Sequence, residues 1–165
     1  MKKIAIFPGS FDPFHIGHET IVRRALSLFD EIIIAIGINT NKREYFPIEL
    51  RLSWIKEVFN DEPKIKVDSY DGLTVDFCKS VNARFILRGL RTAADFEYER
   101  AIAQVNKSME TDIESVFILT TPEYTPVNSS IVRDILRHGG DAKKFLAGHD
   151  ELKDRIIKYI IEDAK

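Results

Sequence analysis

The chain has 165 residues, of which 44% are hydrophobic and 30% are charged, the balance of an ordinary globular domain. Its formal net charge of −2 excludes bulk electrostatic binding to nucleic acid or to an anionic membrane, so any cationic function must rest on a local cluster. Cys78 is the single cysteine, which excludes a disulfide framework and favours a cytoplasmic location. No apolar run approaches membrane-spanning length.

Short apolar runs alternate with helical patterns along the chain. The periodicity predicts strands at residues 4–7, 32–36, 64–68, 84–87 and 114–120. It predicts helices at 20–29, 50–59, 73–81 and 92–108, a further helix between a cap at 128–130 and Gly139, and a C-terminal helix at about 149–162. No regular structure is expected at 121–127, because this segment holds two prolines.

The strand pattern indicates the fold class. The run at 32–36 is apolar on both sides, which is typical of a parallel sheet covered by helices on both faces. We therefore predict one α/β domain over residues 1–165, a doubly wound, Rossmann-like sheet of five parallel strands. Such sheets bind ligands beyond the carboxyl ends of their strands, near the reversal of strand order. The polar loops expected to converge there are 8–17, 37–42, 88–91 and 121–130.

The decapeptide at 9–18 stands between the first strand and the first helix. Its glycines let a ligand approach the backbone, and a helix N-terminus attracts anions. His15 and His18 add donors that are neutral or charged near pH 7. Such a turn often serves only as a tight connection, and a histidine there often only caps the helix. The whole decapeptide in this position favours a phosphate site, although it matches neither the Walker A nor the dinucleotide fingerprint.

Cations and hydroxyls dominate the other loops at this edge of the predicted sheet. Lys42, Arg88 and Arg91 suit phosphate, and Ser129 and Ser130 stand at a helix start. No activated nucleophile is evident among these loops, and no cluster of metal ligands stands out. This pattern favours a reaction driven by positioning and by stabilisation of charge at phosphorus.

Several motifs carry a family resemblance. His15-Ile16-Gly17-His18 resembles the first signature of the nucleotidyltransferase superfamily, and residues 129–133 resemble the second. The first signature also occurs in class I aminoacyl-tRNA synthetases, which are much longer chains. Four further segments are similar to the bacterial phosphopantetheine adenylyltransferases, a similarity that extends to about Arg137: 8–13, 39–46, 88–91 and 95–99.

The resemblance implies one nucleotidyltransferase domain that transfers the adenylyl group of ATP to 4′-phosphopantetheine, giving 3′-dephospho-coenzyme A and pyrophosphate. It implies that His18 is catalytic and stabilises the charge that develops at the α-phosphorus. The residues that it assigns to 4′-phosphopantetheine are Ser10, Lys42, Thr74 and Arg88. Those that it assigns to ATP are Ser10, Phe11, His18, Gly89, Leu90, Arg91, Glu99, Tyr124, Thr125, Pro126, Val127, Asn128, Ser129 and Ser130.

The same resemblance implies Mg²⁺ that arrives with ATP, a homohexamer in the cytoplasm and feedback inhibition by coenzyme A. It implies no nucleic-acid or membrane partner. The chain departs from the family pattern at His15, which is often Thr, at Thr74, which is often larger and apolar, and at Asn128, which is often Ser. The alternatives are a related nucleotidyltransferase with another acceptor, such as nicotinamide mononucleotide or glycerol phosphate with CTP, and a nucleotide-binding regulator without catalysis.

Overall fold

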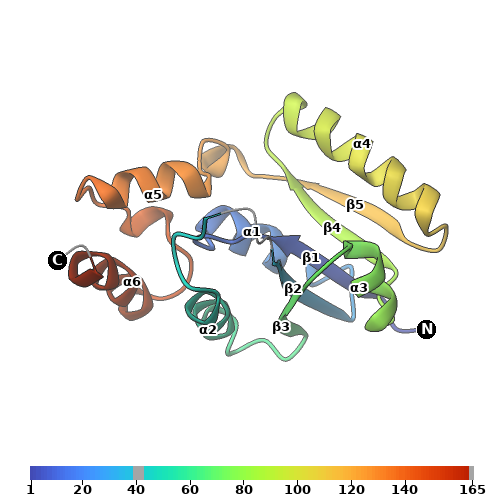
Figure 1. Cartoon of the computed structure of the whole chain (residues 1–165), viewed down its shortest axis with the longest axis horizontal. Helices are drawn as coiled ribbons and strands as arrows, with labels where there is room; N and C mark the ends of the chain where they lie inside the picture. Colours follow the sequence, from blue (N-terminus) through green and yellow to red (C-terminus); the bar gives the residue numbers. More distant parts are fainter. Residues whose placement is uncertain (39–42, 164–165) are drawn as a thin grey trace.

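The computed structural model describes residues 1–38 and 43–163, with side chains up to Tyr159. One sheet of five parallel strands, in the order β3-β2-β1-β4-β5, forms the centre (Figure 1). The strands are β1 (Ile4–Gly9), β2 (Glu31–Gly37), β3 (Ile65–Tyr70), β4 (Phe85–Leu90) and β5 (Glu114–Leu119). The predicted parallel sheet is confirmed. Its strand order reverses between β1 and β4, which places a ligand crevice beyond the ends of these two strands.

Successive strands are connected by helices α1 (Ile16–Ala25), α2 (Ile48–Val58), α3 (Thr74–Ser80) and α4 (Ala93–Met109), and the last strand is followed in the chain by α5 (Ser129–Arg137) and α6 (Asp150–Asp163). Two short 3₁₀ helices are η1 (Pro122–Tyr124) and η2 (Lys143–Phe145). No described helix has both the length and the apolar character needed to cross a membrane. The prediction of no regular structure at 121–127 was wrong for η1, because Pro122 stands at the start of the turn, where a missing N–H is tolerated.

The sheet is buried on both faces at its centre. Ile32, Ile34 and Ile36 of β2 belong to the larger cluster, together with side chains of α1 and α2. Ile33 and Ala35 of the same strand point to a second cluster, which includes α3. The predicted strand with two apolar faces is therefore confirmed.

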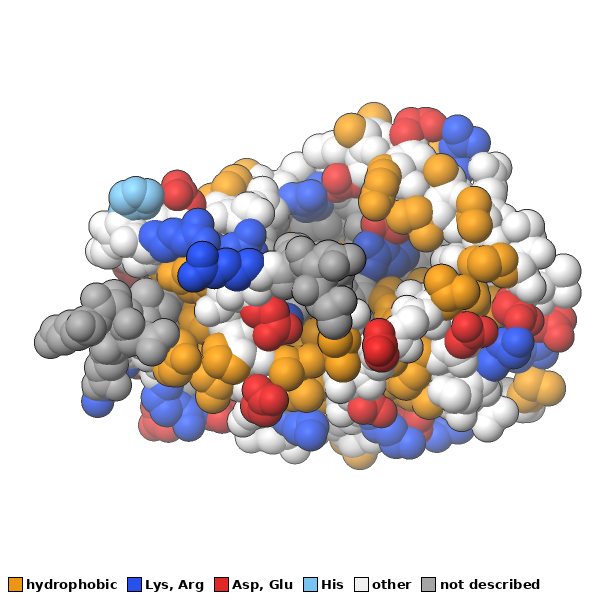
Figure 2. Space-filling view, viewed as in Figure 1, with side chains coloured by type: hydrophobic (Ala, Val, Ile, Leu, Met, Phe, Trp, Pro, Cys, Tyr) orange, Lys and Arg blue, Asp and Glu red, His pale blue; other side chains and the backbone are white. Residues whose placement is uncertain are grey.

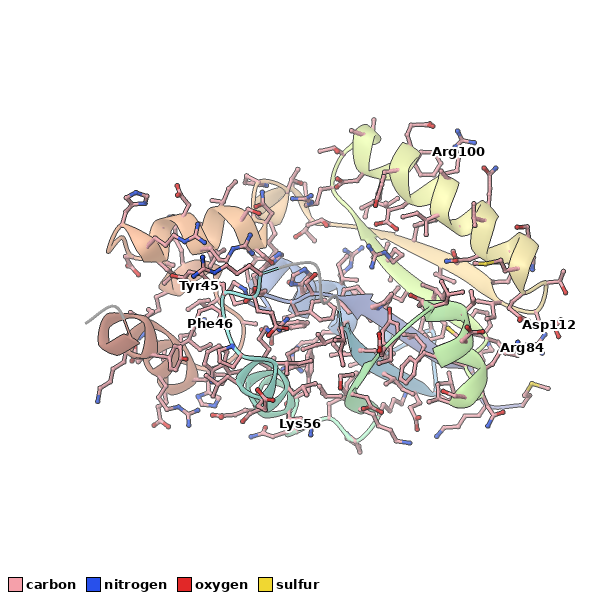
Figure 3. All side chains as sticks on the ribbon, in the orientation of Figure 1. Tyr45, Phe46, Lys56, Arg84, Arg100 and Asp112 are labelled. Carbon is pink, nitrogen blue, oxygen red and sulfur yellow. The ribbon has the colours of Figure 1, made fainter. Side chains whose placement is uncertain are left out.

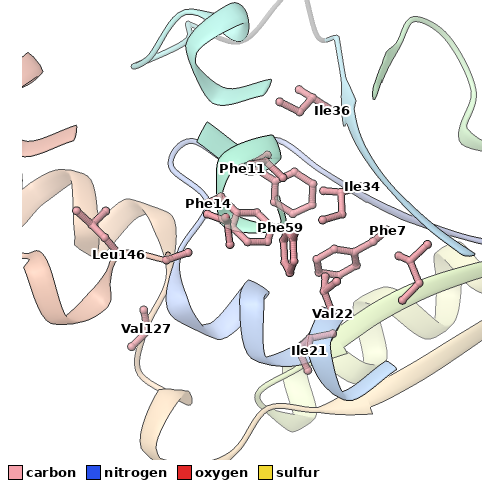
Figure 4. Packing of buried hydrophobic residues seen from close by; sticks show 14 of the residues in the cluster. Phe7, Phe11, Phe14, Ile21, Val22, Ile34, Ile36, Phe59, Val127 and Leu146 are labelled. Atoms are coloured by element: carbon pink, nitrogen blue, oxygen red, sulfur yellow. The ribbon is translucent and has the colours of Figure 1, made fainter. Parts of the chain in front are cut away.

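Aromatic rings extend the larger cluster to the end of β1. Figure 4 shows Phe7, Phe11, Phe14 and Phe59 packed together beside Ile34 of β2. The Phe11 ring lies 5.3 Å from Phe7 and 5.2 Å from Phe14, measured between centroids. The loop after β1 is thus fastened by its own side chains, which gives the residues between them fixed positions.

Two element boundaries at the crevice differ from the prediction. Helix α1 begins at Ile16, because His15 is its N-cap and the His18 side chain returns to the His15 N–H. Strand β4 continues to Leu90, which pairs with Leu119 of β5. Arg88 and Gly89 are therefore strand residues, because the pairing between β4 and β5 continues beyond the apolar run that predicted the strand.

Candidate active site

A cleft of about 320 Å³ lies beyond the ends of β1 and β4. Its walls come from the loop after β1, the first turns of α1 and α5, the end of β4 and the start of α4. Residues of three of the four predicted loops, 8–17, 88–91 and 121–130, thus meet at this cleft, and Gly37 and Ile38 of the fourth line an adjoining cavity. The lining residues are Phe7, Pro8, Gly9, Ser10, Phe11, Asp12, His15, Gly17, His18, Ile21, Arg88, Gly89, Arg91, Asp95, Glu99, Thr120, Val127, Asn128, Ser129, Ser130 and Arg133.

A second cavity of about 430 Å³ adjoins the first. The residues common to both are Pro8, Gly9, Ser10, Arg88 and Glu99. Its other walls come from β2, β3, α3 and α4: Gly37, Ile38, Tyr70, Thr74, Ile102, Ala103 and Asn106, with Ile86 and Ser115 beneath. Two neighbouring compartments with a shared wall suit a reaction between two substrates.

The shared wall holds an ion pair between β4 and α4. Arg88 Nε donates to Glu99 Oε2 at 2.8 Å, Arg88 Nη2 donates to Glu99 Oε1, and Arg88 Nη1 donates to the Pro8 carbonyl. This bidentate geometry fixes the plane of the guanidinium. The guanidinium carries more N–H donors than these bonds use, so Arg88 retains donors for a phosphate in either compartment.

His18 stands in the first turn of α1, at the foot of the first cleft. Its Nδ1 accepts the backbone N–H of His15 at 3.2 Å, which assigns the ring proton to Nε2. The ring packs against Phe11 and Phe14, with centroids 5.0 and 5.2 Å away. Burial lowers the pKa of His18 well below 6.5, and neighbouring His15, Arg88 and Arg91 lower it further. His18 is therefore a neutral hydrogen-bond donor near pH 7 rather than a cation.

His15 stacks on His18 with centroids 3.5 Å apart and planes inclined at 24°. It is 5% exposed, and burial together with the nearby Arg91 lowers the pKa of His15 to about 3. A Cβ at position 17 would lie 3.0 Å from His15 Cε1, so the glycine of the first signature makes room for this ring. Among the described side chains, His15 Nδ1 is one of two buried polar atoms without a hydrogen-bond partner.

The start of α5 forms the wall opposite β4. Asn128 caps this helix by accepting the Ile131 N–H at 2.9 Å, which confirms the predicted cap. Ser129 Oγ donates to the Pro13 carbonyl at 3.0 Å, and Arg133 Nη1 donates to the Asp12 carbonyl at 2.7 Å. These bonds hold the N-termini of α1 and α5 toward one cleft, where both helix dipoles favour an anion.

The structure gathers most of the predicted site residues. Those that line the first cleft are Ser10, Phe11, His18, Arg88, Gly89, Arg91, Glu99, Val127, Asn128, Ser129 and Ser130. Thr74 lines the second cavity, where its hydroxyl lies 2.7 Å from the Tyr70 hydroxyl. Lys42 lies outside the described residues. Four predicted ATP contacts line neither cavity, and their roles stay predictions: Leu90, Tyr124, Thr125 and Pro126.

Sequence reasoning gave no role to four polar residues of the first cleft: Asp12, Asp95, Thr120 and Arg133. Asp12 stands in the decapeptide at 9–18 and Arg133 in the second signature, so these motifs were the signal. Asp95 accepts the backbone N–H of Arg91 at 3.0 Å and also its guanidinium, so it orients this cation. Thr120 follows β5, and only the sheet topology brings it to the cleft.

The described carboxylates of the cleft already have partners. Asp12 accepts two backbone N–H groups, Asp95 pairs with Arg91, and Glu99 pairs with Arg88. Among residues 1–38 and 43–163, no group of three or more His, Cys, Asp or Glu side chains could hold a metal ion. The cleft therefore presents N–H groups, hydroxyls and guanidinium groups, a lining that suits an anion.

This fold and this cleft define a class of nucleotide-handling α/β enzymes, and the comparisons with known proteins agree. The family model described as cytidylyltransferase-like matches residues 6–135. Among solved structures, the nicotinic acid mononucleotide adenylyltransferase of Plasmodium falciparum superposes with a TM-score of 0.66 and 22% identity over 99% of this chain and 98% of that chain. At this identity the likeness shows the fold alone.

Curated relatives are more similar in sequence. The phosphopantetheine adenylyltransferase of Flavobacterium psychrophilum is 56% identical over 86% of this chain and 92% of that protein. Those of Bacteroides fragilis and Bacteroides thetaiotaomicron are 52% and 54% identical, over 86% and 88% of this chain and 94% and 95% of theirs. The chain belongs to the cytidylyltransferase-like nucleotidyltransferases and, within them, to the phosphopantetheine adenylyltransferase family.

Proposed function

We propose that the chain transfers the adenylyl group of ATP to 4′-phosphopantetheine, giving 3′-dephospho-coenzyme A and pyrophosphate in coenzyme A biosynthesis. The observation that carries this proposal is the pair of adjoining cavities that share Ser10, Arg88 and Glu99. The first, with two helix N-termini, suits a triphosphate. The second, between α3 and α4, suits a phosphorylated acceptor with an extended arm. Relatives about half identical to the chain carry this activity in their names.

The proposed reaction is an in-line displacement at the α-phosphorus. An oxygen of the acceptor phosphate forms a bond to this phosphorus, and the bond to the oxygen that bridges to the β-phosphorus breaks, with its electron pair leaving on pyrophosphate. The attacking phosphate is already anionic, so no general base is required. Arg88 holds the acceptor phosphate, and the neutral His18 donates from Nε2 to the oxygens that gain charge.

ATP enters as its magnesium complex in this proposal. Because the cleft carboxylates Asp12, Asp95 and Glu99 are engaged by N–H groups or arginines, the phosphates and water hold the ion. When bound, Mg²⁺ screens the phosphate charge. Arg91, Ser130 and the start of α5 hold the rest of the nucleotide.

The assembly and regulation expected from the family also belong to this proposal. The cytoplasmic homohexamer is inferred from the family, and an interface between copies is supported by α4, where Tyr98, Val105 and Met109 are exposed. Figure 2 shows hydrophobic side chains gathered over this helix. Coenzyme A carries the same pantetheine arm as the acceptor, so it would compete for the second cavity and act as a feedback inhibitor. Sedimentation velocity tests the hexamer, and coenzyme A inhibition competitive with the acceptor tests the regulation.

Pyrophosphate release with ATP and a panel of acceptors tests the reaction. Rapid release with 4′-phosphopantetheine and background release with nicotinamide mononucleotide are expected, and glycerol phosphate with CTP extends the panel. Absence of turnover with 4′-phosphopantetheine would overturn the proposal. Turnover with nicotinamide mononucleotide alone would establish the alternative acceptor, and ATP binding without turnover on any acceptor would indicate a regulator.

A further inference from the structure

Arg51 of α2 lines neither cavity, and it is a charged residue that is almost fully buried, with 3% of its surface exposed. Its Nη1 donates to the Ser10 carbonyl at 2.6 Å, and its Nε donates to the Phe46 carbonyl at 2.9 Å. Its Nη2 pairs with Glu44. One guanidinium therefore ties the loop after β1 to the segment at 44–46.

Asp12 ties the same two segments together from the opposite direction. Its Oδ2 accepts the Tyr45 N–H at 2.8 Å, and its Oδ1 accepts the Phe46 N–H at 2.9 Å. Tyr45 and Phe46, both labelled in Figure 3, also pack against the C-terminal helices: Arg137 of α5 lies over the Tyr45 ring, and Tyr159 of α6 lies beside the buried Phe46. The backbone of 44–46 is thereby fixed through its N–H groups and its carbonyl.

The anchored part of the loop has an unfavourable backbone conformation. Phe11, between Ser10 and Asp12, has a φ of +47°, in the left-handed region that residues other than glycine rarely adopt. Such a conformation persists only where its surroundings determine it. Arg51 donates to the carbonyl of Ser10, the residue before Phe11. Asp12, the residue after Phe11, accepts N–H groups of the segment at 44–46. These bonds hold Ser10 at the wall that both cavities share.

Burial of a guanidinium is costly unless its N–H groups are satisfied. Glu44, the carboxylate paired with Arg51, is 45% exposed, so one partner of the ion pair stays in contact with water. What Arg51 supplies is a planar fork that reaches three acceptors on two segments, which a lysine cannot reproduce.

We propose that Arg51 is a positioning residue for the acceptor side of the site. It holds Ser10 and fixes the segment that begins two residues after Lys42, the lysine predicted to bind the acceptor phosphate. Ser10 is assigned to both substrates, but Arg91, Asn128 and Ser130, which are assigned to the nucleotide alone, are not among the partners of Arg51. Loss of the fork should therefore impair acceptor use more than ATP binding. This inference rests on the proposed function.

Arg51→Lys tests the proposal, with Ile55→Ala as the matched control. Ile55 lies one turn further along α2, is fully buried and lines neither cavity. Arg51→Lys is expected to raise KM for 4′-phosphopantetheine about tenfold while the Kd of ATP changes by less than about twofold. Ile55→Ala, which lowers stability but removes no side-chain hydrogen bond to either segment, should leave both constants near those of the parent. An unchanged KM in Arg51→Lys, or the same increase in Ile55→Ala, would overturn the proposal.

Hydrogen exchange of the ligand-free chain separates this inference from the proposed function. Faster exchange at the Tyr45 and Phe46 amides in Arg51→Lys than in Ile55→Ala is expected, whichever acceptor the parent uses. An inactive parent with this exchange pattern would overturn the proposed function alone, whereas equal exchange in the two variants would overturn the role of Arg51. If Arg51→Lys does not fold, Glu44→Ala, which removes the exposed partner of the guanidinium, tests the role of Arg51 instead. A selective rise in the acceptor KM of about threefold supports the role, and no change refutes it.

Discussion

The centre of the sheet and the flank formed by β5 and α4 are built differently. Six of the seven residues of β2 are buried, whereas no residue of β5 is. In the 17 residues of α4 the single buried side chain is Glu99, which is charged and paired with Arg88. Hydrocarbon burial stabilises the centre, while the flank is fastened through an ion pair in the wall of the active site. The pair that helps to hold α4 is therefore itself part of the cleft wall.

The largest effect is expected at the cleft, where the two regions meet. His18→Ala removes the Nε2 donor and should lower kcat about 10²–10³-fold, while the Kd of ATP changes little. His138→Ala, an exposed histidine at the far end of α5, is the matched control and should retain full turnover. Single-turnover kinetics and calorimetric ATP titration measure the two quantities. Unchanged turnover in His18→Ala would refute the role given to this ring.

A pair of valine truncations compares the regions directly. Val22 of α1 is fully buried and Val105 of α4 is 57% exposed. Val22→Ala should lower the free energy of unfolding by about 2–3 kcal/mol through lost burial and a residual cavity, and Val105→Ala by less than about 0.5 kcal/mol. Urea unfolding at low protein concentration is the measurement. A loss of unfolding free energy in Val105→Ala that grows with protein concentration would show that a second copy of the chain covers α4. Equal losses in the two variants at low concentration would contradict the difference between the centre and the flank.

Acid should weaken the fold through the buried His15 beside the cleft. The pKa of His15 is lowered to about 3 from 6.5, so the unfolded chain binds the extra proton between these values, and stability falls as pH drops below about 6.5. Above that range His15 is neutral in both states. His15→Thr should therefore reduce the loss of unfolding free energy between about pH 7 and pH 5 by about 2 kcal/mol. Urea titrations at the two pH values measure it, and an unaltered pH dependence would contradict the burial argument.

The smallest effect is expected when Glu99, the buried carboxylate of α4, is replaced by an uncharged side chain. Glu99→Gln keeps the shape of the side chain but loses the charge-assisted bonds to Arg88, so the free energy of unfolding should fall by about 1 kcal/mol, with faster hydrogen exchange confined to α4. Glu97→Gln is the matched control, because Glu97 stands on the same helix in an exposed pair with Arg100. Similar exchange in the two variants would show that the ion pair does not hold α4.

Much of the fold was predictable because apolar periodicity reports burial directly. The run at 32–36 is apolar on both sides, and β2 is buried on both faces. Boundaries were less predictable where a contact distant in sequence, or a side chain that returns to the backbone, decides them. Strand β4 extends through Arg88 and Gly89 because β5 pairs with it, and α1 begins at Ile16 because His18 caps the His15 N–H.

The residues of the candidate site also fall into those that the sequence predicts and those that only distant contacts reveal. Residue type and position after predicted strands pointed to Ser10, His18, Arg88 and Arg91, because such groups suit phosphate, and all four line the first cleft. The same properties gave no role to Arg51, which reads as one more charge on a predicted helix. Its function follows from Ser10 and Phe46, which lie 41 and 5 residues away along the chain.

The sequence by itself determined the alternation of strands and helices, the chemistry carried by the loops and the resemblance to a family, because periodicity, residue type and spacing are local properties. The tertiary structure decided that the cleft is divided at an Arg88–Glu99 pair, that His18 is neutral with its proton on Nε2, and that a buried guanidinium holds Ser10. These properties depend on burial and on contacts between distant segments. Such contacts exist only once the sheet brings the carboxyl ends of its strands together.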